Sequence, residues 1–131
     1  MPLTATIPAL AAAAFLLTGA ALAAVDVSRL RGAWVAPAAA SLVFAAFSLV
    51  TVALEGPLGF WPIHTHDLWG NQVWIDLLLA ALVAFAALAP TARALGMRPL
   101  PWFLAVAASG SIGLLAMAAR VLYLREQAGR R

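Results

Sequence analysis

The chain alternates long apolar runs with short polar segments. Four runs carry no charge or a single charged residue, and they cover residues 4–25, 34–54, 72–89 and 101–124. A helix of about 20 apolar residues, rising about 1.5 Å per residue, crosses the ~30 Å hydrocarbon core of a bilayer. The pattern therefore predicts four membrane-spanning helices.

The segments between these runs are short, at residues 26–33, 55–71 and 90–100. Short connections make consecutive helices antiparallel neighbours. We therefore expect an all-α fold, an integral membrane four-helix antiparallel bundle that forms a single domain over residues 1–131. Pro90 and Pro101 are expected at helix boundaries, because proline lacks a backbone donor and disfavours a helix interior.

The tryptophans fit this arrangement. Trp34 and Trp102 begin the second and fourth runs, whereas Trp61, Trp69 and Trp74 lie in or beside the central segment. Tryptophan concentrates at both membrane–water interfaces. The two groups are therefore expected at opposite faces of the membrane.

The composition places the chain among membrane proteins. Hydrophobic residues make up 65% and charged residues 10%, with a mean hydropathy of +0.98, whereas about a quarter of the residues in soluble domains are charged. All eight basic residues are arginines at the ends of the runs, which excludes a nucleic-acid interface. The absence of cysteine excludes disulfides and thiol chemistry. The first run resembles a secretory signal peptide, but no basic residue precedes it, so we expect a retained helix.

The arginines do not determine the orientation of the helices in the membrane. Positive flanking residues normally concentrate on the cytoplasmic side. In a four-helix bundle they split equally, with Arg29, Arg31, Arg93 and Arg98 on one side and Arg120, Arg125, Arg130 and Arg131 on the other. Because the charges flanking the first helix usually determine the orientation of the whole protein, we expect both termini and the central segment to face outward.

Small residues predict where helices pack, because close backbone approach favours helix association in lipid. Two runs carry residues of this kind at four-residue spacing: Ala105, Ser109, Gly113 and Met117 in the fourth, and Phe15, Gly19 and Ala23 in the first. We expect Ser109 and Gly113 to face another helix.

The central segment "GFWPIHTHDLWGNQVWID" gathers most of the polar chemistry. In an extended chain His64 and His66 point the same way, and with Asp67 and Glu55 they could hold a divalent ion such as zinc. One His-x-His pair is an unspecific signal, so no metal is expected and a polar interfacial loop is favoured. In that loop Asp67 or Asn71 caps the third helix. No cofactor is evident, because paired haem ligands require histidines on facing helices.

Asp76 lies about one turn inside the third run. A carboxylate near hydrocarbon is costly, so it is a candidate functional group that faces the bundle interior. We expect it to pair with a donor in a polar cluster of six residues: His64, His66, Asp67, Gln72, Asp76 and Arg120. No catalytic residue is assigned, and the candidates for an acid or base are Asp76 and Glu55.

The motif "ARALGMRPLPWFL" and the closing "LYLRE" resemble the C-terminal half of a bacterial family of small four-helix membrane proteins, defined only as a domain of unknown function. The matching positions are Asp76 and residues 92–97 and 122–126, and the resemblance covers about residues 55–126. The chain departs from the family pattern in the His-x-His segment and in "MAAR" before the closing motif. The resemblance implies an integral membrane protein and no reaction.

Two classes of function remain open. The sequence favours a multi-pass protein of the cell membrane, in bacteria the inner membrane, that is not an enzyme. Such a protein would be an accessory or scaffold subunit of a larger membrane complex, or a bundle that binds a lipid, pigment or quinone. Its expected partners are membrane lipid and either other membrane-protein subunits or an apolar ligand, with no nucleic acid.

The alternative is an intramembrane enzyme that acts on an isoprenoid-like apolar substrate, with Asp76 or Glu55 as acid or base. Transport is less favoured, because no inverted repeat or broken helix is visible in the sequence.

Overall fold

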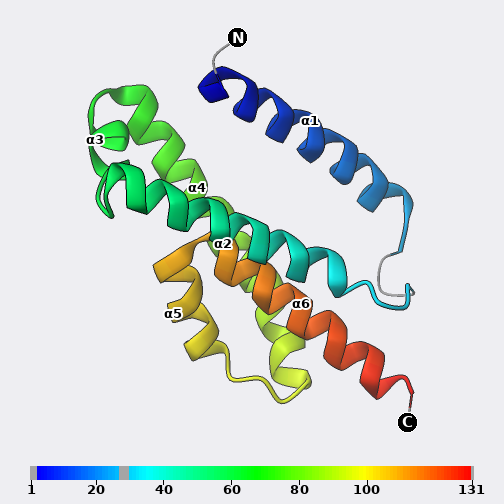
Figure 1. The fold of residues 1–131 in the computed structure, drawn as a ribbon. Helices are drawn as coiled ribbons and strands as arrows, with labels where there is room; N and C mark the ends of the chain where they lie inside the picture. The colour runs from blue at the N-terminus through cyan, green and yellow to red at the C-terminus, as the bar shows by residue number, and fades with distance from the viewer. Residues whose placement is uncertain (1–2, 27–29, 131) are drawn as a thin grey trace. The chain divides into compact units, whose positions relative to one another are not determined.

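The computed structural model describes residues 3–26 and 30–130, and every regular element in them is a helix, which confirms the all-α class. The chain divides into an N-terminal unit, Met1–Arg31, and a C-terminal unit, Gly32–Arg131. Figure 1 shows the helices of both. Three of those described, α1, α2 and α4, are long and apolar enough to cross a membrane.

The N-terminal unit consists mainly of α1, Leu3–Ala24, which matches the first predicted run within one residue at each end. Its stretch Thr6–Ala24 has a mean hydropathy of 2.0. Phe15, Gly19 and Ala23 are all exposed, and nothing lies within 4 Å of a Cβ built on Gly19. The packing role predicted for these residues therefore stays a prediction.

The C-terminal unit contains five helices: α2, Val35–Glu55; α3, Phe60–Thr65; α4, Leu68–Ala94; α5, Pro99–Ser109; and α6, Ser111–Ala128. The bounds of α2 differ from the predicted second run by one residue at each end. Helix α6 packs against α2, α4 and α5, while α3 packs against the start of α4. The core is the buried cluster Ala92, Met117 and Val121, so α6 is the central element of this unit.

The predicted continuous fourth helix is wrong, because the chain breaks between α5 and α6. Gly110 has φ 58° and ψ −123°, a conformation that residues with a Cβ rarely adopt. Helices α5 and α6 consequently form a hairpin whose tip lies beside the middle of α2, where the Ser41 hydroxyl donates to the Ile112 carbonyl at 2.9 Å. A four-helix antiparallel bundle is therefore not confirmed.

The hairpin returns the end of α6 to the start of α2. The Gly32 N–H donates to Oε2 of Glu126 at 3.0 Å, and the rings of Trp34 and Tyr123 lie 5.5 Å apart, edge to face. The predicted equal division of the arginines is therefore wrong for this unit. Its described arginines share one end, called here the arginine end: Arg93, Arg98, Arg120, Arg125 and Arg130. Arg29 and Arg131 lie outside the described residues.

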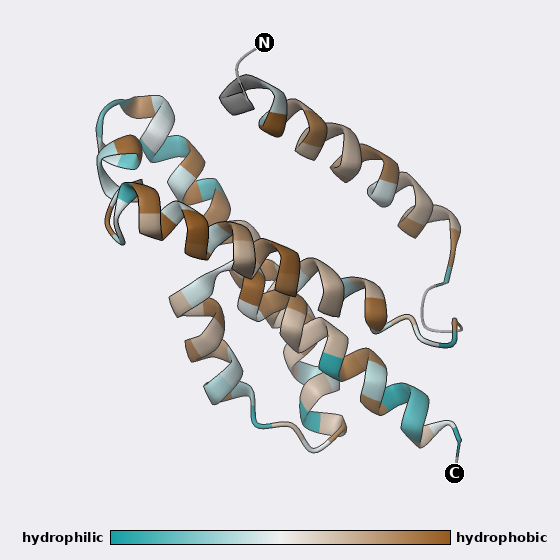
Figure 2. Ribbon diagram, viewed as in Figure 1, coloured by the Kyte–Doolittle hydropathy of each residue, from teal (hydrophilic) through white to brown (hydrophobic). Residues whose placement is uncertain are grey.

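The opposite end, called here the acid end, comprises the last turn of α2, α3 and the first half of α4. It carries Glu55, Asp67 and Asp76, together with both histidines and no arginine. Figure 2 shows hydrophilic residues towards both ends of the C-terminal unit and mostly hydrophobic ones between them. The C-terminal unit therefore carries its positive charges at one end and most of its negative charges at the other.

Helix α4 begins earlier and ends later than the third predicted run. Pro90 lies inside the helix rather than at its boundary, because the last turn is held by Ala92, which is fully buried against α6. Beyond it the Gly96 N–H donates to the Arg93 carbonyl at 3.0 Å and the Met97 N–H to the Ala92 carbonyl at 2.9 Å. This is the Schellman pattern of a helix end, and it needs the positive φ of Gly96.

Ser109 and Gly113 do face another helix, as predicted, although the reason differs. The Ser109 hydroxyl of α5 donates to the Ala105 carbonyl at 2.7 Å and accepts from the Gly113 N–H of α6 at 3.1 Å. A Cβ on Gly113 would lie 2.7 Å from the Ala105 carbonyl carbon. These residues hold the two arms of the hairpin together rather than forming one stripe on a single helix.

Candidate functional site

The acid end is organised around the start of α4. Asp67 has extended backbone geometry, and its Oδ1 accepts from the Gly70 N–H at 2.7 Å, so it is the N-cap of α4, as predicted. This bond and the nearby His66 ring lower the pKa of the Asp67 carboxyl below its ordinary value. Asp67 therefore serves as an ionised helix cap.

His64 lies in α3 and packs against aromatic side chains. Its ring centre is 4.9 Å from that of Trp74 and 6.3 Å from that of Phe60. Gly70 permits this, because its lack of a side chain lets the backbone of Ile63 and His64 approach α4 closely. The Nδ1 atom of His64 is buried and has no hydrogen-bond partner. His64 therefore fastens α3 to α4 through its ring.

The predicted metal-binding alternative does not match the geometry. His64 and His66 lie in helical rather than extended backbone, so residues two apart diverge. The His66 side chain is 84% exposed, and its Nδ1 lies 3.4 Å from Oδ2 of Asp67. In the part of the chain that the structure describes, no three histidine or acidic side chains converge on a point that could hold a metal ion.

Asp76 is exposed on α4, and no hydrogen bond or ion pair of its side chain is found among residues 32–130. Gln72 is exposed one turn earlier on the same face, and Glu55 is exposed at the end of α2. The predicted inward pairing of Asp76 is therefore not formed. The prediction assumed a fourth helix running to this end, whereas the α5–α6 hairpin turns back before reaching it.

Arg120 lies at the arginine end, across the unit from Asp76, because α6 runs away from the acid end. The structure thus places His66 beside Asp67 and His64 against Trp74. It leaves Gln72 and Asp76 on a separate exposed face and places Arg120 at the other end of the unit. The six predicted residues do not form one cluster.

Two hollows lie in the surface of the C-terminal unit, and the larger of these two is on the acid-end side of the hairpin tip. This apolar cavity has a volume of about 910 Å³ and lies between the second half of α2 and the first half of α4. Aromatic side chains line it at Phe44, Phe60, Trp74, Phe85 and Phe103, and none of its lining residues is titratable.

The polar groups of the apolar cavity are serine hydroxyls near the hairpin tip. Ser109 is engaged within the hairpin, whereas the hydroxyls of Ser48 and Ser111 have no hydrogen-bond partner among the described residues. A serine hydroxyl can donate one hydrogen bond and accept two. Ser48 and Ser111 could therefore orient a polar group of a ligand that is otherwise apolar.

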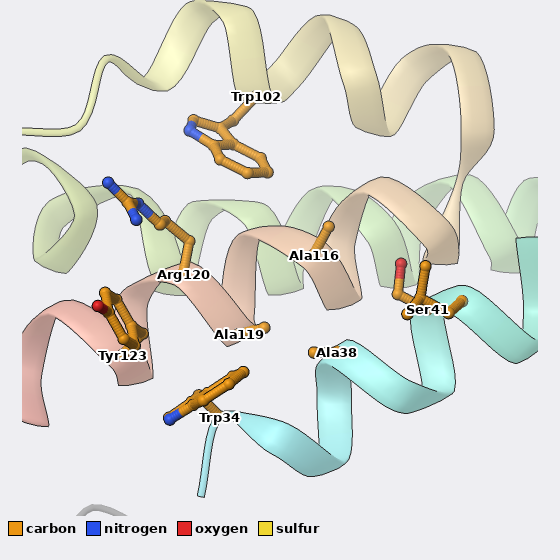
Figure 3. A pocket seen from close by; sticks show the side chains of 9 residues that line it. Trp34, Ala38, Ser41, Trp102, Ala116, Ala119, Arg120 and Tyr123 are labelled. Carbon is orange, nitrogen blue, oxygen red and sulfur yellow. The ribbon is translucent and has the colours of Figure 1, made fainter. Parts of the chain in front are cut away.

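A second hollow, called here the arginine-end pocket, has a volume of about 480 Å³ between α2, α5 and α6. Figure 3 shows the small side chains Ala38, Ala116 and Ala119 along it, with Ser41 at one end and Arg120 and Tyr123 at the other. The indole rings of Trp34 and Trp102 also line it. The pocket therefore changes along its length from charged and aromatic to apolar.

Comparison of the chain with protein-family models, curated proteins and solved structures finds no match. The resemblance of residues 92–97 and 122–126 to a four-helix membrane family accordingly stays a prediction. The two hollows are known from the geometry of the structure alone, and the sequence pattern predicts neither. The sequence does contain a sign of the hairpin that forms them, the "SGS" at residues 109–111, since serine–glycine pairs mark turns.

Proposed function

We propose that the protein resides in a membrane, in bacteria the inner membrane, with α2 and α4 spanning the bilayer. The α5–α6 hairpin enters from the arginine end and turns near the middle. In support, the 11 residues of α5 reach about 16 Å, roughly half of a ~30 Å hydrocarbon core. Backbone that leaves the helix at this depth needs partners within the protein, and Ser41 and Ser109 supply them.

Within that frame the protein binds a prenyl quinone in the apolar cavity. The observation that carries this proposal is the cavity itself, since ligand sites typically enclose about 300–1,000 Å³ lined by apolar and aromatic groups with a few polar ones. The isoprenoid chain lies along α2 and α4. The quinone carbonyls accept from the hydroxyls of Ser48 and Ser111, which otherwise lack partners.

Binding is favoured over catalysis because the cavity has no acid or base. Asp76 and Glu55 do not line it. Asp76 is two residues from Trp74, and at about 100° per residue it lies on nearly the opposite face of α4 from that cavity-lining ring. General acid–base catalysis requires the group to reach the proton it moves. The enzyme alternative therefore has no support from the arrangement of these residues.

The test is a titration of the detergent-solubilised protein with ubiquinone-2, followed by quenching of tryptophan fluorescence. Trp74→Phe shows which part of the signal comes from the cavity. Ala81→Phe fills the cavity, in which Ala81 is a lining residue, and should weaken binding at least tenfold. Ala87→Phe adds the same ring to an exposed position of α4 outside the cavity and should bind as wild type. Equal affinity for wild type and Ala81→Phe contradicts the proposal.

A second candidate function, an accessory subunit of a larger complex, is favoured by one observation. Asp76 is exposed about 12 Å beyond the start of α4. A carboxylate facing lipid is costly, so such groups usually face protein or water. If a partner covers it, Asp76→Leu should reduce the size of the particle extracted gently from the native membrane. An unchanged particle rules out a role of Asp76 in assembly.

A further inference from the structure

The arginine-end pocket has unsatisfied donors at one end. Figure 3 shows the guanidinium of Arg120, the hydroxyl of Tyr123 and the indole nitrogens of Trp34 and Trp102 all towards the same end. Among residues 32–130 none of these four groups has a hydrogen-bond or ion-pair partner. The Arg120 guanidinium carbon lies 5.7 Å from the centre of the Tyr123 ring, which fixes its direction. The pocket mouth therefore offers several donors and no acid.

The charge around this mouth is also uncompensated. The arginine end carries five described arginines, and its one described acid is Glu126. Glu126 is already engaged, because it accepts from the Gly32 N–H at 3.0 Å and from Arg130 at 2.7 Å. At the arginine end no described acid of the C-terminal unit is free to pair with the exposed Arg120, so the mouth of the pocket suits an anionic ligand.

The rest of the pocket selects for an apolar tail. Behind the mouth the lining consists of Ala38, Leu42, Ala116 and Ala119, and the Ser41 hydroxyl at the far end is occupied by the Ile112 carbonyl. Small side chains on α2 and α6 leave an open apolar groove that no polar group of the protein fills. A free anion would use the mouth and leave this length empty.

We propose that the arginine-end pocket binds one anionic phospholipid. The phosphate accepts hydrogen bonds from the Arg120 guanidinium, and one acyl chain lies along the alanines towards Ser41. Arginine suits phosphate because its donors form a fork. Tryptophan and tyrosine favour the headgroup level, and basic pockets between membrane helices bind anionic headgroups. The site is separate from the apolar cavity and does not depend on quinone binding.

The test is native mass spectrometry of the full chain in mild detergent, with phosphatidylglycerol and phosphatidylcholine in competition. We expect wild type to retain phosphatidylglycerol in preference. Arg120→Gln should lower that affinity about fivefold, the factor that one basic side chain contributes near an anionic surface. Arg125→Gln is the matched control, since it removes the same charge from an exposed position of α6 that does not line the pocket. It should leave the affinity unchanged.

Two further measurements separate the lipid from simpler ligands. Ala116→Leu fills the groove while Arg120 stays in place, and it should also lose phosphatidylglycerol. Full retention overturns the acyl-chain part of the proposal. Excess inorganic phosphate should fail to displace the lipid, and displacement would identify a plain anion site. Equal losses in Arg120→Gln and Arg125→Gln, or no preference in wild type, overturn the site altogether. The melting temperature of each variant should be measured as well, to test whether it remains folded.

Discussion

Asp67 determines where α4 begins. Its carboxylate accepts from the Gly70 N–H at 2.7 Å and lies 3.4 Å from Nδ1 of His66, and these contacts hold its pKa below the ordinary 3.8. Because the folded pKa lies below the unfolded one, the stabilisation is complete above about pH 4. It is lost as the pH falls through the lowered folded pKa. The cap is therefore a source of acid sensitivity.

Asp67→Ala should lower the melting temperature at pH 7, because alanine leaves the Gly70 N–H without its acceptor. Asp67→Asn still offers an acceptor but cannot titrate. It should keep most of the melting temperature at pH 7 and lose less than wild type when the pH is taken below about 4. Circular dichroism melts in detergent across this range test both variants. An alanine variant that melts with wild type at pH 7 contradicts the cap.

Asp76→Asn should change the stability of the isolated chain by less than about 0.5 kcal/mol, the range typical of surface substitutions that break no contact. The reason is that the Asp76 carboxylate is exposed and has no partner among residues 32–130. Denaturation in detergent measures this. A loss of stability as large as that of Asp67→Ala would mean that a partner within the chain has been overlooked.

The difference between Asp67 and Asp76 shows what the sequence could predict about single residues. A helix cap depends on spacing to a neighbour three residues away, so Asp67 could be predicted from local sequence. The surroundings of Asp76 depend on where a segment more than thirty residues later runs. The same is true of Arg120, whose end of the molecule follows from the direction of α6 rather than from its own neighbours.

At the scale of the elements, the α5–α6 hairpin depends on two glycines for different reasons. Gly110 supplies a positive φ at the turn, with open space around it. Gly113 has ordinary helical geometry, but a Cβ there would lie 2.7 Å from Ala105 and 2.8 Å from the Val106 nitrogen, both backbone contacts. One residue makes the turn and the other lets the two arms meet.

Gly113→Ala should destabilise the protein by about 1–3 kcal/mol, the usual cost of overpacking a tight contact. Gly110→Ala should cost a similar amount through backbone strain. Gly129→Ala is the matched control, because its Cβ would make only ordinary contacts at 3.7 Å and beyond. Thermal melts compare the three variants. Melting of Gly113→Ala together with Gly129→Ala would show that the arms do not pack as described.

The long helices could be predicted well, and the hairpin could not. Helices α1 and α2 end within a residue of their predicted bounds, because an uninterrupted apolar run is enough to define each. Residues 101–124 form a run of the same kind, and glycine is common in membrane helices, so hydropathy predicts Gly110 to lie within a span. The break between α5 and α6 depends on the contacts of α6 with α2 and α5, and hydropathy contains no information about these contacts.

At the scale of the molecule, the hairpin changes the distribution of charge. With α6 returning, every described arginine of the C-terminal unit lies at one end, and the carboxylates of Glu55, Asp67 and Asp76 lie towards the other. Positive residues flanking membrane helices favour the cytoplasmic side. The arginine end is therefore expected in the cytoplasm and α3 outside. The end of α6 thus lies away from the central segment, contrary to the prediction that the C-terminus and the central segment share a side.

The absence of cysteine makes this arrangement directly testable by single-cysteine labelling. Leu58→Cys places a thiol between α2 and α3, and Gly129→Cys places one after α6; both positions are exposed. In intact cells a membrane-impermeant maleimide should label the first variant, and the second only after permeabilisation. Helix α2 begins at the arginine end and finishes beside residue 58, whereas α6 finishes at the arginine end beside residue 129. The two thiols should therefore lie on opposite sides of the bilayer if the hairpin stops halfway. A continuous fourth span would carry residue 129 to the side of residue 58, and both variants would then label identically. Wild type, with no thiol, gives the background for each measurement.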